Sequence, residues 1–270
     1  MTNDNMTIRY VLVTGVAGGM GRETAIYLRD LGYQVIGLDL KPTQIDGVEC
    51  VRIDLTNTVA VERLASKFAK RKLTLYAIVH QAGIYDLDSL VEIDEKRFCR
   101  IFDVNLFSVY RLNKAMIPLL SEGSRIIITS SELAPLMPLP FTGLYAITKT
   151  AIERYAFSLR HELNLKGIYV SVIRPGATDT GLLGDSQSAL DKFVNQTTLY
   201  DTNAVRFKQI VDSVENKNIP PLRIAKLVAK ALSAKRPKYV YNINRNILLR
   251  ILNVLPHRLQ VWIITKILKK

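Results

Sequence analysis

Cysteine is scarce in this chain of 270 residues, which holds only Cys50 and Cys99. Two cysteines cannot build the multi-bridge framework of a small secreted domain, and neither belongs to a Cys-x-x-Cys pair. Residues 1–9 contain no apolar core of a secretion signal. No apolar run approaches the ~18 residues that a membrane-spanning helix needs. We therefore expect a reduced protein in the cytoplasm.

Acidic residues are absent from the last fifth of the chain. Residues 1–216 contain 24 Lys or Arg and 24 Asp or Glu, whereas residues 217–270 contain 13 Lys or Arg and no acid. The formal net charge of +13 therefore belongs to the C-terminal segment. A nucleic-acid-binding protein more often spreads its charge over one face or a recognition element, so nucleic acid is a disfavoured partner.

Short apolar segments alternate with helical patterns along most of the chain. Because these segments are continuously apolar, we expect strands of a parallel sheet that is buried on both faces. The pattern predicts an α/β fold with a single doubly wound domain over residues 1–245. The expected strands are 10–13, 34–38, 48–53, 75–79, 125–129, 169–173 and 238–243, and the expected helices include 22–31, 56–71, 96–119 and 144–165.

A glycine-rich turn joins the first expected strand to the first expected helix. Glycine permits positive φ and close backbone approach, and a helix N-terminus offers free N–H groups to a pyrophosphate. Asp39 ends the second expected strand, where a carboxylate binds the adenosine ribose and repels a 2′-phosphate. Asp39 thus favours NAD, while nearby Lys41 keeps NADP as the alternative. The turn is Gly15-Val16-Ala17-Gly18-Gly19-Met20-Gly21.

Tyr145 and Lys149 share one face of an expected helix, since they are four residues apart. A nearby cation favours a phenolate, so we expect Lys149 to lower the Tyr145 pKa and make Tyr145 a general acid/base. Ser131 follows an apolar strand, at the sheet edge where ligands bind. Asn105 lies inside a long expected helix although Asn is a poor helix former, which points to a functional role. The alternative is a structural role, in which the buried amide satisfies backbone groups.

Together these residues resemble the short-chain dehydrogenase/reductase family, over about residues 7–245. The resemblance implies a Rossmann-type sheet of about seven strands and hydride transfer to or from nicotinamide. It implies that Tyr145 exchanges a proton with the substrate oxygen and that Ser131 binds this oxygen. Lys149 would bind the nicotinamide ribose, and Asn105 would hold a water in the proton relay. No metal is implied.

The resemblance also implies a set of residues around the dinucleotide. Asp54 and Leu55 would flank the adenine, Thr180 would contact the carboxamide, and Ile173 and Pro175 would line the nicotinamide ring. The expected cofactor-binding residues are Gly15, Ala17, Gly18, Gly19, Met20, Gly21, Asp39, Leu40, Asp54, Leu55, Gln81, Ala82, Gly83, Tyr145, Lys149, Pro175, Gly176, Thr178 and Thr180.

Two features depart from the family pattern. The chain has His80-Gln81-Ala82-Gly83 where the family usually has Asn-Asn-Ala-Gly; we expect a structural role for His80. The interval from Ser131 to Tyr145 is 14 residues instead of 13, so Ser130 and Glu132 are alternatives for the serine. Ser131 is preferred because a carboxylate would repel the developing oxyanion.

The substrate side is expected to be apolar. Residues 180–219 are weakly periodic and match a region that forms a mobile lid in the family. This lining suits a bulky lipophilic alcohol or ketone better than a sugar; packing of half these side chains in the core is the alternative. The expected lining is Leu133, Leu136, Met137, Leu139, Phe141, Leu182, Leu183, Phe193, Val194, Leu199 and Phe207.

Residues 246–270 are expected to form a basic, amphipathic helical extension that Pro256 interrupts. Packing on its own domain or a neighbouring subunit is one interpretation, and peripheral contact with an anionic membrane is another. An acidic partner is a third. The helices at 96–119 and 144–165 resemble the family's subunit interface, so a homodimer or homotetramer is expected.

The sequence therefore predicts an NAD-dependent oxidoreductase that interconverts a secondary alcohol and a ketone. A hydroxysteroid, a retinoid or a similar lipid is the preferred substrate class. The alternative is a non-catalytic nucleotide sensor or a membrane-recruited scaffold on the same fold.

Overall fold

A sheet of seven parallel strands dominates the computed structural model, which describes residues 9–179, 181–214 and 218–269. The strand order is β3-β2-β1-β4-β5-β6-β7. The order reverses between β1 and β4, and in such sheets ligands bind at the reversal, beyond the carboxyl ends of the strands. The doubly wound sheet is confirmed. The strands are β1 Tyr10–Thr14, β2 Gln34–Asp39, β3 Glu49–Arg52, β4 Leu75–His80, β5 Leu120–Thr129, β6 Tyr169–Pro175 and β7 Val240–Ile243.

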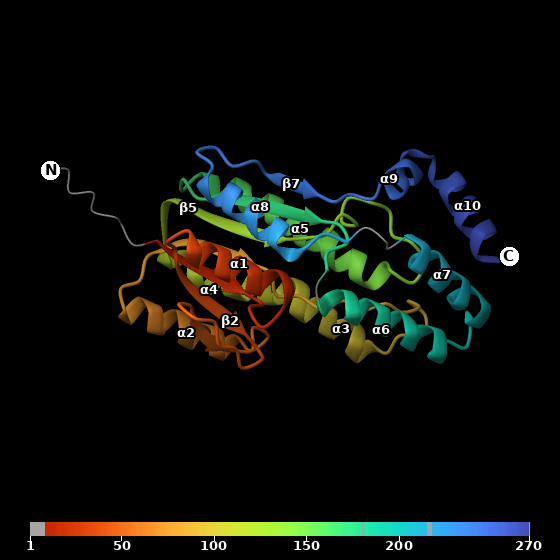
Figure 1. Cartoon of the computed structure of the whole chain (residues 1–270), viewed down its shortest axis with the longest axis horizontal. Coiled ribbons are helices and arrows are strands. Elements are labelled where there is room, and N and C mark those ends of the chain that lie inside the picture. The colour runs from red at the N-terminus through yellow and green to blue at the C-terminus, as the bar shows by residue number, and fades with distance from the viewer. Residues whose placement is uncertain (1–8, 180, 215–217, 270) are drawn as a thin grey trace.

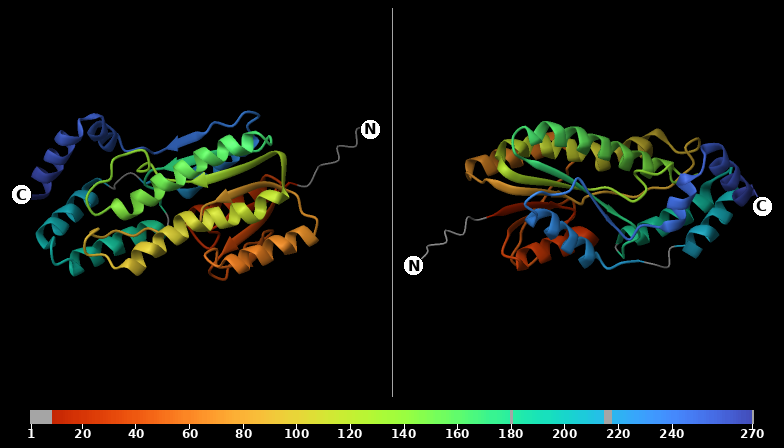
Figure 2. Two further views of the ribbon diagram at one scale, coloured as in Figure 1. Left: turned by 180° about the vertical axis from the view of Figure 1, so that it is seen from behind. Right: turned by 90° about the horizontal axis from the view of Figure 1, so that it is seen from above.

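Helices cover both faces of this sheet (Figure 1, Figure 2). Val11 and Val13 of β1 pack with α1 and α8 on one face, whereas Leu12 packs with α2 and α4 on the other. All three side chains are fully buried, which explains why the strands are apolar at every position. The helices of these two layers are α1 Gly19–Asp30, α2 Thr58–Lys70, α4 Ser108–Met116, α5 Gly143–Asn164 and α8 Pro221–Ser233.

The helix expected over residues 96–119 is interrupted. It begins as α3 (Glu95–Phe102), passes through a π-helical turn at Asp103–Phe107, and continues as α4 to end in a 3₁₀ turn at Ile117–Leu119. Asp94 caps α3 by accepting a hydrogen bond from the N–H of Arg97. Single π turns are frequent at functional sites, and this one contains Asn105.

Two helices occupy the weakly periodic region, α6 (Gly181–Gln196) and α7 (Asp201–Val214). Phe193 of α6 and Phe207 of α7 pack on Leu87, in a small core at the ligand-binding end of the sheet. Glu92 binds the turn between them, accepting from the Thr197 hydroxyl among other groups, and these bonds lower its pKa to about 2. The weakly periodic region therefore has regular structure that the sequence pattern did not predict.

The C-terminal extension forms α9 (Ile247–Val254) and α10 (His257–Lys269), on either side of Pro256. They lie at the same end of the molecule as α6 and α7 (Figure 1). Leu268 of α10 enters the core beneath α7, and Asn203 donates a hydrogen bond to its carbonyl. Among the described residues, no helix combines the length and apolarity needed to cross a membrane.

Candidate active site

Two glycines of the glycine-rich turn, Gly15 and Gly21, are packed too closely to carry a side chain. A Cβ on Gly21 would lie 2.1 Å from the Gly15 carbonyl oxygen, and a Cβ on Gly15 would lie 2.9 Å from the Ala82 nitrogen. Gly15 also has φ +78°, which favours glycine. Gly18, just before α1, faces open space. The turn therefore leaves room for a phosphate at the N-terminus of α1.

Asp39 is fixed at the edge of this turn. Its carboxylate accepts hydrogen bonds from the N–H of Ala17, at 2.8 Å, and of Lys41, at 2.9 Å. A cavity with a volume of about 420 Å³ runs past Asp39 toward Asp54. Of the expected cofactor-binding residues, thirteen line this cavity: Gly15, Ala17, Gly18, Gly19, Met20, Gly21, Asp39, Leu40, Asp54, Leu55, Gln81, Ala82 and Gly83.

The buried side-chain oxygen and nitrogen of Gln81 find no hydrogen-bond partner among the described residues. The Thr14 hydroxyl accepts hydrogen bonds from the N–H of Gln81 and Ala82, but the side-chain Oε1 and Nε2 of Gln81 are unsatisfied. Buried polar groups normally have hydrogen-bond partners, and a bound ligand could supply them for these two atoms. The open turn, the fixed carboxylate and this amide together fit a dinucleotide.

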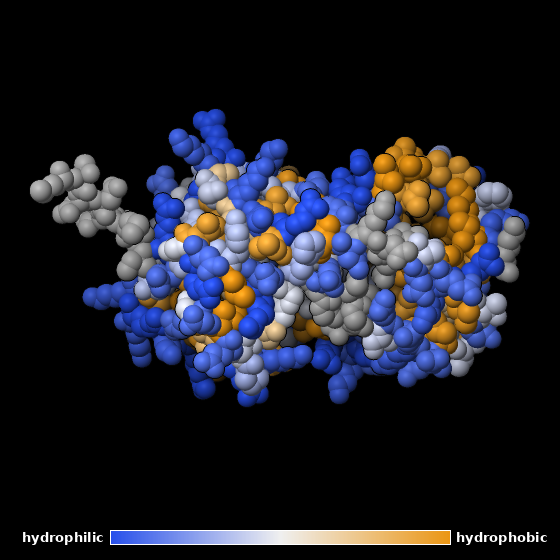
Figure 3. Space-filling model, viewed as in Figure 1, coloured by the Kyte–Doolittle hydropathy of each residue, from blue (hydrophilic) through white to orange (hydrophobic). Residues whose placement is uncertain are grey.

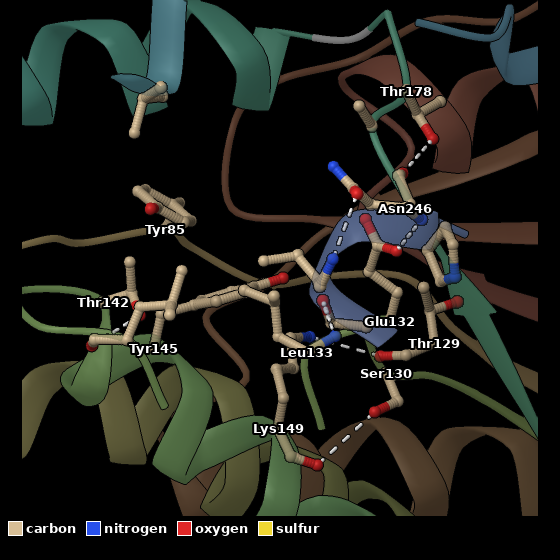
Figure 4. A pocket seen from close by; sticks show the side chains of 18 of the residues that line it. Tyr85, Thr129, Ser130, Glu132, Leu133, Thr142, Tyr145, Lys149, Thr178 and Asn246 are labelled. Carbon is tan, nitrogen blue, oxygen red and sulfur yellow. Dashed lines mark hydrogen bonds between the residues drawn. The ribbon is translucent and has the colours of Figure 1, made fainter. Parts of the chain in front are cut away.

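Tyr145 and Lys149 lie near each other on α5, both buried (Figure 4). The Lys149 Nζ lies 5.4 Å from the centroid of the Tyr145 ring and donates a hydrogen bond to the Thr129 carbonyl at 3.2 Å. Burial raises the pKa of Tyr145 to about 12 and lowers the pKa of Lys149 to about 8. The expected lowering of the Tyr145 pKa is thus wrong for this arrangement, because burial removes the hydration that stabilises a phenolate, and the hydrogen bond with Ser131 offsets this only in part.

The three candidates for the serine position point to different partners. Ser131 makes a side-chain hydrogen bond with Tyr145, which opposes the rise of the tyrosine pKa. The Ser130 hydroxyl donates instead to the Lys149 carbonyl, at 3.4 Å. Glu132 turns to Asn246 (Figure 4). Geometry therefore favours Ser131 as the partner of the phenol.

Asn105 lies behind the two cavities and lines neither. Its Oδ1 accepts from the N–H of Ile84 at 2.8 Å, and its Nδ2 donates to the Ile84 carbonyl and to the Thr148 hydroxyl. The amide thus ties the segment after β4 to α5. The role in a proton relay stays a prediction.

A second cavity, with a volume of about 320 Å³, opens beside Tyr145. Of the predicted catalytic and cofactor-binding residues, nine line it: Met20, Gln81, Gly83, Ser131, Tyr145, Lys149, Pro175, Gly176 and Thr178; Thr180 lies outside the described residues. Since Met20, Gln81 and Gly83 also line the first cavity, the two spaces adjoin. Sequence reasoning missed Tyr85, Thr129, Thr142, Ile210, Val211, Asn246 and Leu249 here, and Arg100 in the first cavity.

The apolar lining was predicted only in part. Leu133, Leu139 and Phe207 face the cavity. Phe193 packs instead against Phe141, in the core beneath α7. Val194 also packs against that core, and Leu199 and Met137 are exposed. Leu136 does not line the cavity, and the side chains of Leu182 and Leu183 lie outside the described residues.

His80 is buried at the end of β4, away from both cavities. Its Nε2 lies 2.8 Å from the Asn113 Oδ1. Burial lowers the pKa of His80 to about 4, so the ring is neutral. This position is structural, as the sequence suggests.

The doubly wound sheet, the glycine-rich turn and the Tyr145/Lys149 pair define an oxidoreductase that uses a dinucleotide. A family model described as short chain dehydrogenase matches residues 9–191. The chain therefore belongs to the short-chain dehydrogenase family and is an NAD(P)-dependent oxidoreductase.

Curated relatives agree with this membership. The 3-ketodihydrosphingosine reductase of Bacteroides thetaiotaomicron is 25% identical over 236 residues, which cover 87% of each chain. The estradiol 17-beta-dehydrogenase 2 of Mus musculus is 26% identical over 257 residues, covering 86% of this chain and 67% of the relative. The NADPH-dependent 3-dehydrocapnine reductase of Ornithobacterium rhinotracheale is 26% identical and covers 97% and 98%.

A solved short-chain dehydrogenase from Streptomyces avermitilis has the same fold. It superposes with a TM-score of 0.74 at 22% identity, over 88% of both chains. This likeness confirms the Rossmann-type architecture.

Proposed function

We propose that this protein is an NAD(H)-dependent oxidoreductase that interconverts a secondary alcohol and a ketone on a bulky lipophilic substrate, such as a hydroxysteroid, a retinoid or a similar lipid. The observation that carries the proposal is that Ser131 and Tyr145, whose side chains interact, lie together in the wall of a mostly apolar cavity. A paired hydroxyl and phenol can hold one oxygen atom and exchange a proton with it.

Tyr145 acts as the proton donor in the reductive direction. Its pKa of about 12 keeps the phenol protonated at neutral pH, and Ser131 orients the substrate oxygen beside it. The hydride would come from a dinucleotide bound in the adjoining cavity, and in the reverse direction the carbinol carbon would return it to that group. In the oxidative direction, the alcohol proton passes to a Tyr145 phenolate, which is scarce at neutral pH.

Lys149 sits where the two cavities adjoin. A Cβ on Gly83, which lines both cavities, would lie 3.7 Å from its Nζ. The ammonium has donors beyond the one that binds the Thr129 carbonyl. These donors can hold the nicotinamide ribose, and the positive charge stabilises a phenolate that forms on Tyr145.

A preference for NAD is supported by Asp39. Two backbone N–H groups hold its carboxylate at the edge of the cavity, where a 2′-phosphate would meet a fixed negative charge. Lys41 also lines this cavity and is the group that would favour NADP. The Ornithobacterium relative carries NADPH in its name.

A lipophilic substrate is supported by the cavity lining. Four separate segments contribute apolar side chains: the segments after β4 and β5, helix α7 and helix α9. Several polar side chains of the lining are engaged within the protein, since Thr142 donates to the Leu139 carbonyl, Thr178 donates to the Gly176 carbonyl and Glu132 accepts from the Asn246 N–H. These groups are less available to the hydroxyls of a sugar. Two relatives are named for 3-ketodihydrosphingosine and estradiol, both bulky and lipophilic. The apolar contributors are Ile84, Leu133, Leu139, Phe207, Ile210, Val211 and Leu249.

A homodimer or homotetramer is supported by apolar side chains on the outer face of the α4 and α5 layer. Phe107, Tyr110 and Phe157 are each nearly half exposed there. Such patches commonly mark subunit interfaces. Phe157→Asp is expected to yield monomers by light scattering, whereas an oligomer unaffected by this change would contradict this face.

Free Cys50 and Cys99 fit a reducing, cytoplasmic location.

The decisive experiment is a panel of ketones and alcohols assayed with NAD(H) and NADP(H) separately. We expect turnover of steroids, retinoids or sphingoid ketones with NADH. Tyr145→Phe should lower kcat about 1,000-fold while retaining NADH binding, and Tyr27→Phe on α1 is the matched control. Turnover of only small polar alcohols would overturn the lipophilic class. NADH binding without any turnover, and with no effect of Tyr145→Phe, would indicate a nucleotide sensor.

A further inference from the structure

The two tail helices present an apolar face to solvent. On α9, Ile247 is 65% exposed and Val254 is 85% exposed; on α10, Val261 is 64% exposed and Trp262 is 58% exposed. Figure 3 shows the apolar surface gathered over these helices. Side chains of this size seldom cluster in solvent unless a partner covers them. The other exposed members of this tail face are Leu248, Ile251, Leu259 and Ile267.

Basic side chains lie on the same two helices as this tail face, and acids are missing there. Residues 217–270 contain no Asp or Glu. Among the described residues, the ion pairs of the structure involve none of the tail cations. An apolar face with a cationic border is complementary to a bilayer with anionic headgroups. The described cations on the two helices are Arg250, Arg258, Lys266 and Lys269.

The tail face is held in place by contacts on its inner side. Glu132 accepts a hydrogen bond from the Asn246 N–H at 2.5 Å, and Asn253 accepts one from the Met137 N–H at 2.7 Å. Buried Gln260 of α10 donates to the Leu255 carbonyl, which joins the two helices. The apolar side chains therefore stay outside because the polar anchors hold the helices in this orientation.

Helix α9 separates the tail face from the substrate cavity. Leu249 lines the cavity, while its neighbours Leu248 and Ile251 are exposed on the other side of the helix. Helix α9 thus has one side in the apolar cavity and the other in the apolar surface.

We propose that the tail face docks onto an anionic lipid bilayer and that, given the proposed function, the lipophilic substrate reaches the cavity from that bilayer along α9. The helices lie on the membrane and do not span it, in agreement with the lack of a spanning helix among the described residues. A second copy on the same face is a poorer fit, because symmetric pairing would oppose two sets of cations without any acid from the tail.

Flotation of the full chain with vesicles tests the docking. We expect wild type to float with vesicles that contain about 30 mol % phosphatidylserine, much less with pure phosphatidylcholine, and less again in high salt. Val254→Asp with Val261→Asp should weaken the anionic binding at least about tenfold. The matched control is Val59→Asp with Val91→Asp, which places two acids at exposed valines elsewhere.

Other outcomes of the flotation experiment contradict docking of the tail face onto a membrane. Wild type that stays with the soluble fraction, or a tail variant that binds like the control, overturns it. A tail variant that loses an oligomer in light scattering, without any vesicle binding by wild type, assigns this face to a second copy. Turnover of a short, water-soluble ketone is measured without vesicles, so a failure of the oxidoreductase proposal is seen separately. Stimulation by anionic vesicles with a membrane-held ketone should be lost only in the tail variant.

Discussion

The carboxylate of Glu132 accepts a hydrogen bond from the backbone N–H of Asn246, with 2.5 Å between Oε2 and nitrogen. Glu132 follows Ser131, and Asn246 caps α9 by accepting from the N–H of Leu248. This one contact therefore joins the loop that carries the candidate catalytic serine to the helix that walls the substrate cavity. Burial raises the pKa of Glu132, although the bond to Asn246 opposes that rise.

Removal of this carboxylate is expected to loosen α9. Glu132→Ala leaves the Asn246 N–H without its partner and should lower the free energy of unfolding by about 2 kcal/mol. Glu132→Gln keeps an oxygen acceptor and removes a partly buried charge, so its stability should stay near that of wild type. Hydrogen exchange of residues 246–255 should rise in the alanine variant alone. Equal exchange in both variants would show that the contact does not hold the helix.

The pH profiles of the two reaction directions are expected to differ. Reduction needs Tyr145 protonated and Lys149 charged, so its kcat/KM should be flat near neutral pH and fall as pH rises through about 8. Oxidation needs a phenolate, which a pKa of about 12 makes scarce, so its optimum should lie at higher pH than that of reduction. Steady-state rates in both directions measure this.

Lys149→Arg separates the two titrations. The guanidinium stays charged across this range, so the decline of the reduction rate near pH 8 should disappear, even if the overall rate is lower. A decline that persists unchanged in this variant would mean that another group titrates there.

The sequence was sufficient for the parts of the site that follow local rules. Strand apolarity gave the buried sheet, and the turn from Gly15 to Gly21 gave the phosphate site, because a glycine pattern between a strand and a helix is a local signal. The spacing of Tyr145 and Lys149 likewise placed them on one helical face. All three depend on neighbours within a few residues.

Contacts between residues far apart in the sequence could not be predicted from local patterns. Asn246 and Leu249 enter the cavity from a segment more than 100 residues beyond Ser131, and no local pattern orients α9 toward it. The pKa of Tyr145 is raised, opposite to expectation, because it is set by burial, which is a property of the packed protein. The π turn at Asn105 depends on packing in the same way, since its amide is bound to Ile84 and Thr148.

Cofactor choice is expected to depend on the charge of Asp39. Asp39→Asn keeps an oxygen that can accept from Ala17 or Lys41 but removes the negative charge that faces a 2′-phosphate. The ratio of kcat/KM for NADPH to that for NADH should therefore rise at least about tenfold. Asp54→Asn, which removes a charge elsewhere in the same cavity, should leave the ratio nearly unchanged. A wild-type enzyme that already prefers NADPH would refute the assignment of Asp39.

Acid sensitivity of the fold is expected to depend on His80. In the unfolded chain this histidine takes up a proton below its ordinary pKa of 6.5, whereas the buried ring does so only near 4. Between these values the unfolded state binds more protons, so the folded state loses stability as pH falls through this window. Urea unfolding at pH 7.5 and pH 5 should show wild type losing about 2 kcal/mol more than His80→Gln.

Gln keeps a neutral amide that can reach Asn113 but does not titrate, which is why it isolates the protonation. His257→Gln changes an exposed histidine and should behave as wild type. If His80→Gln loses as much stability in acid as wild type, the buried ring is not the group responsible.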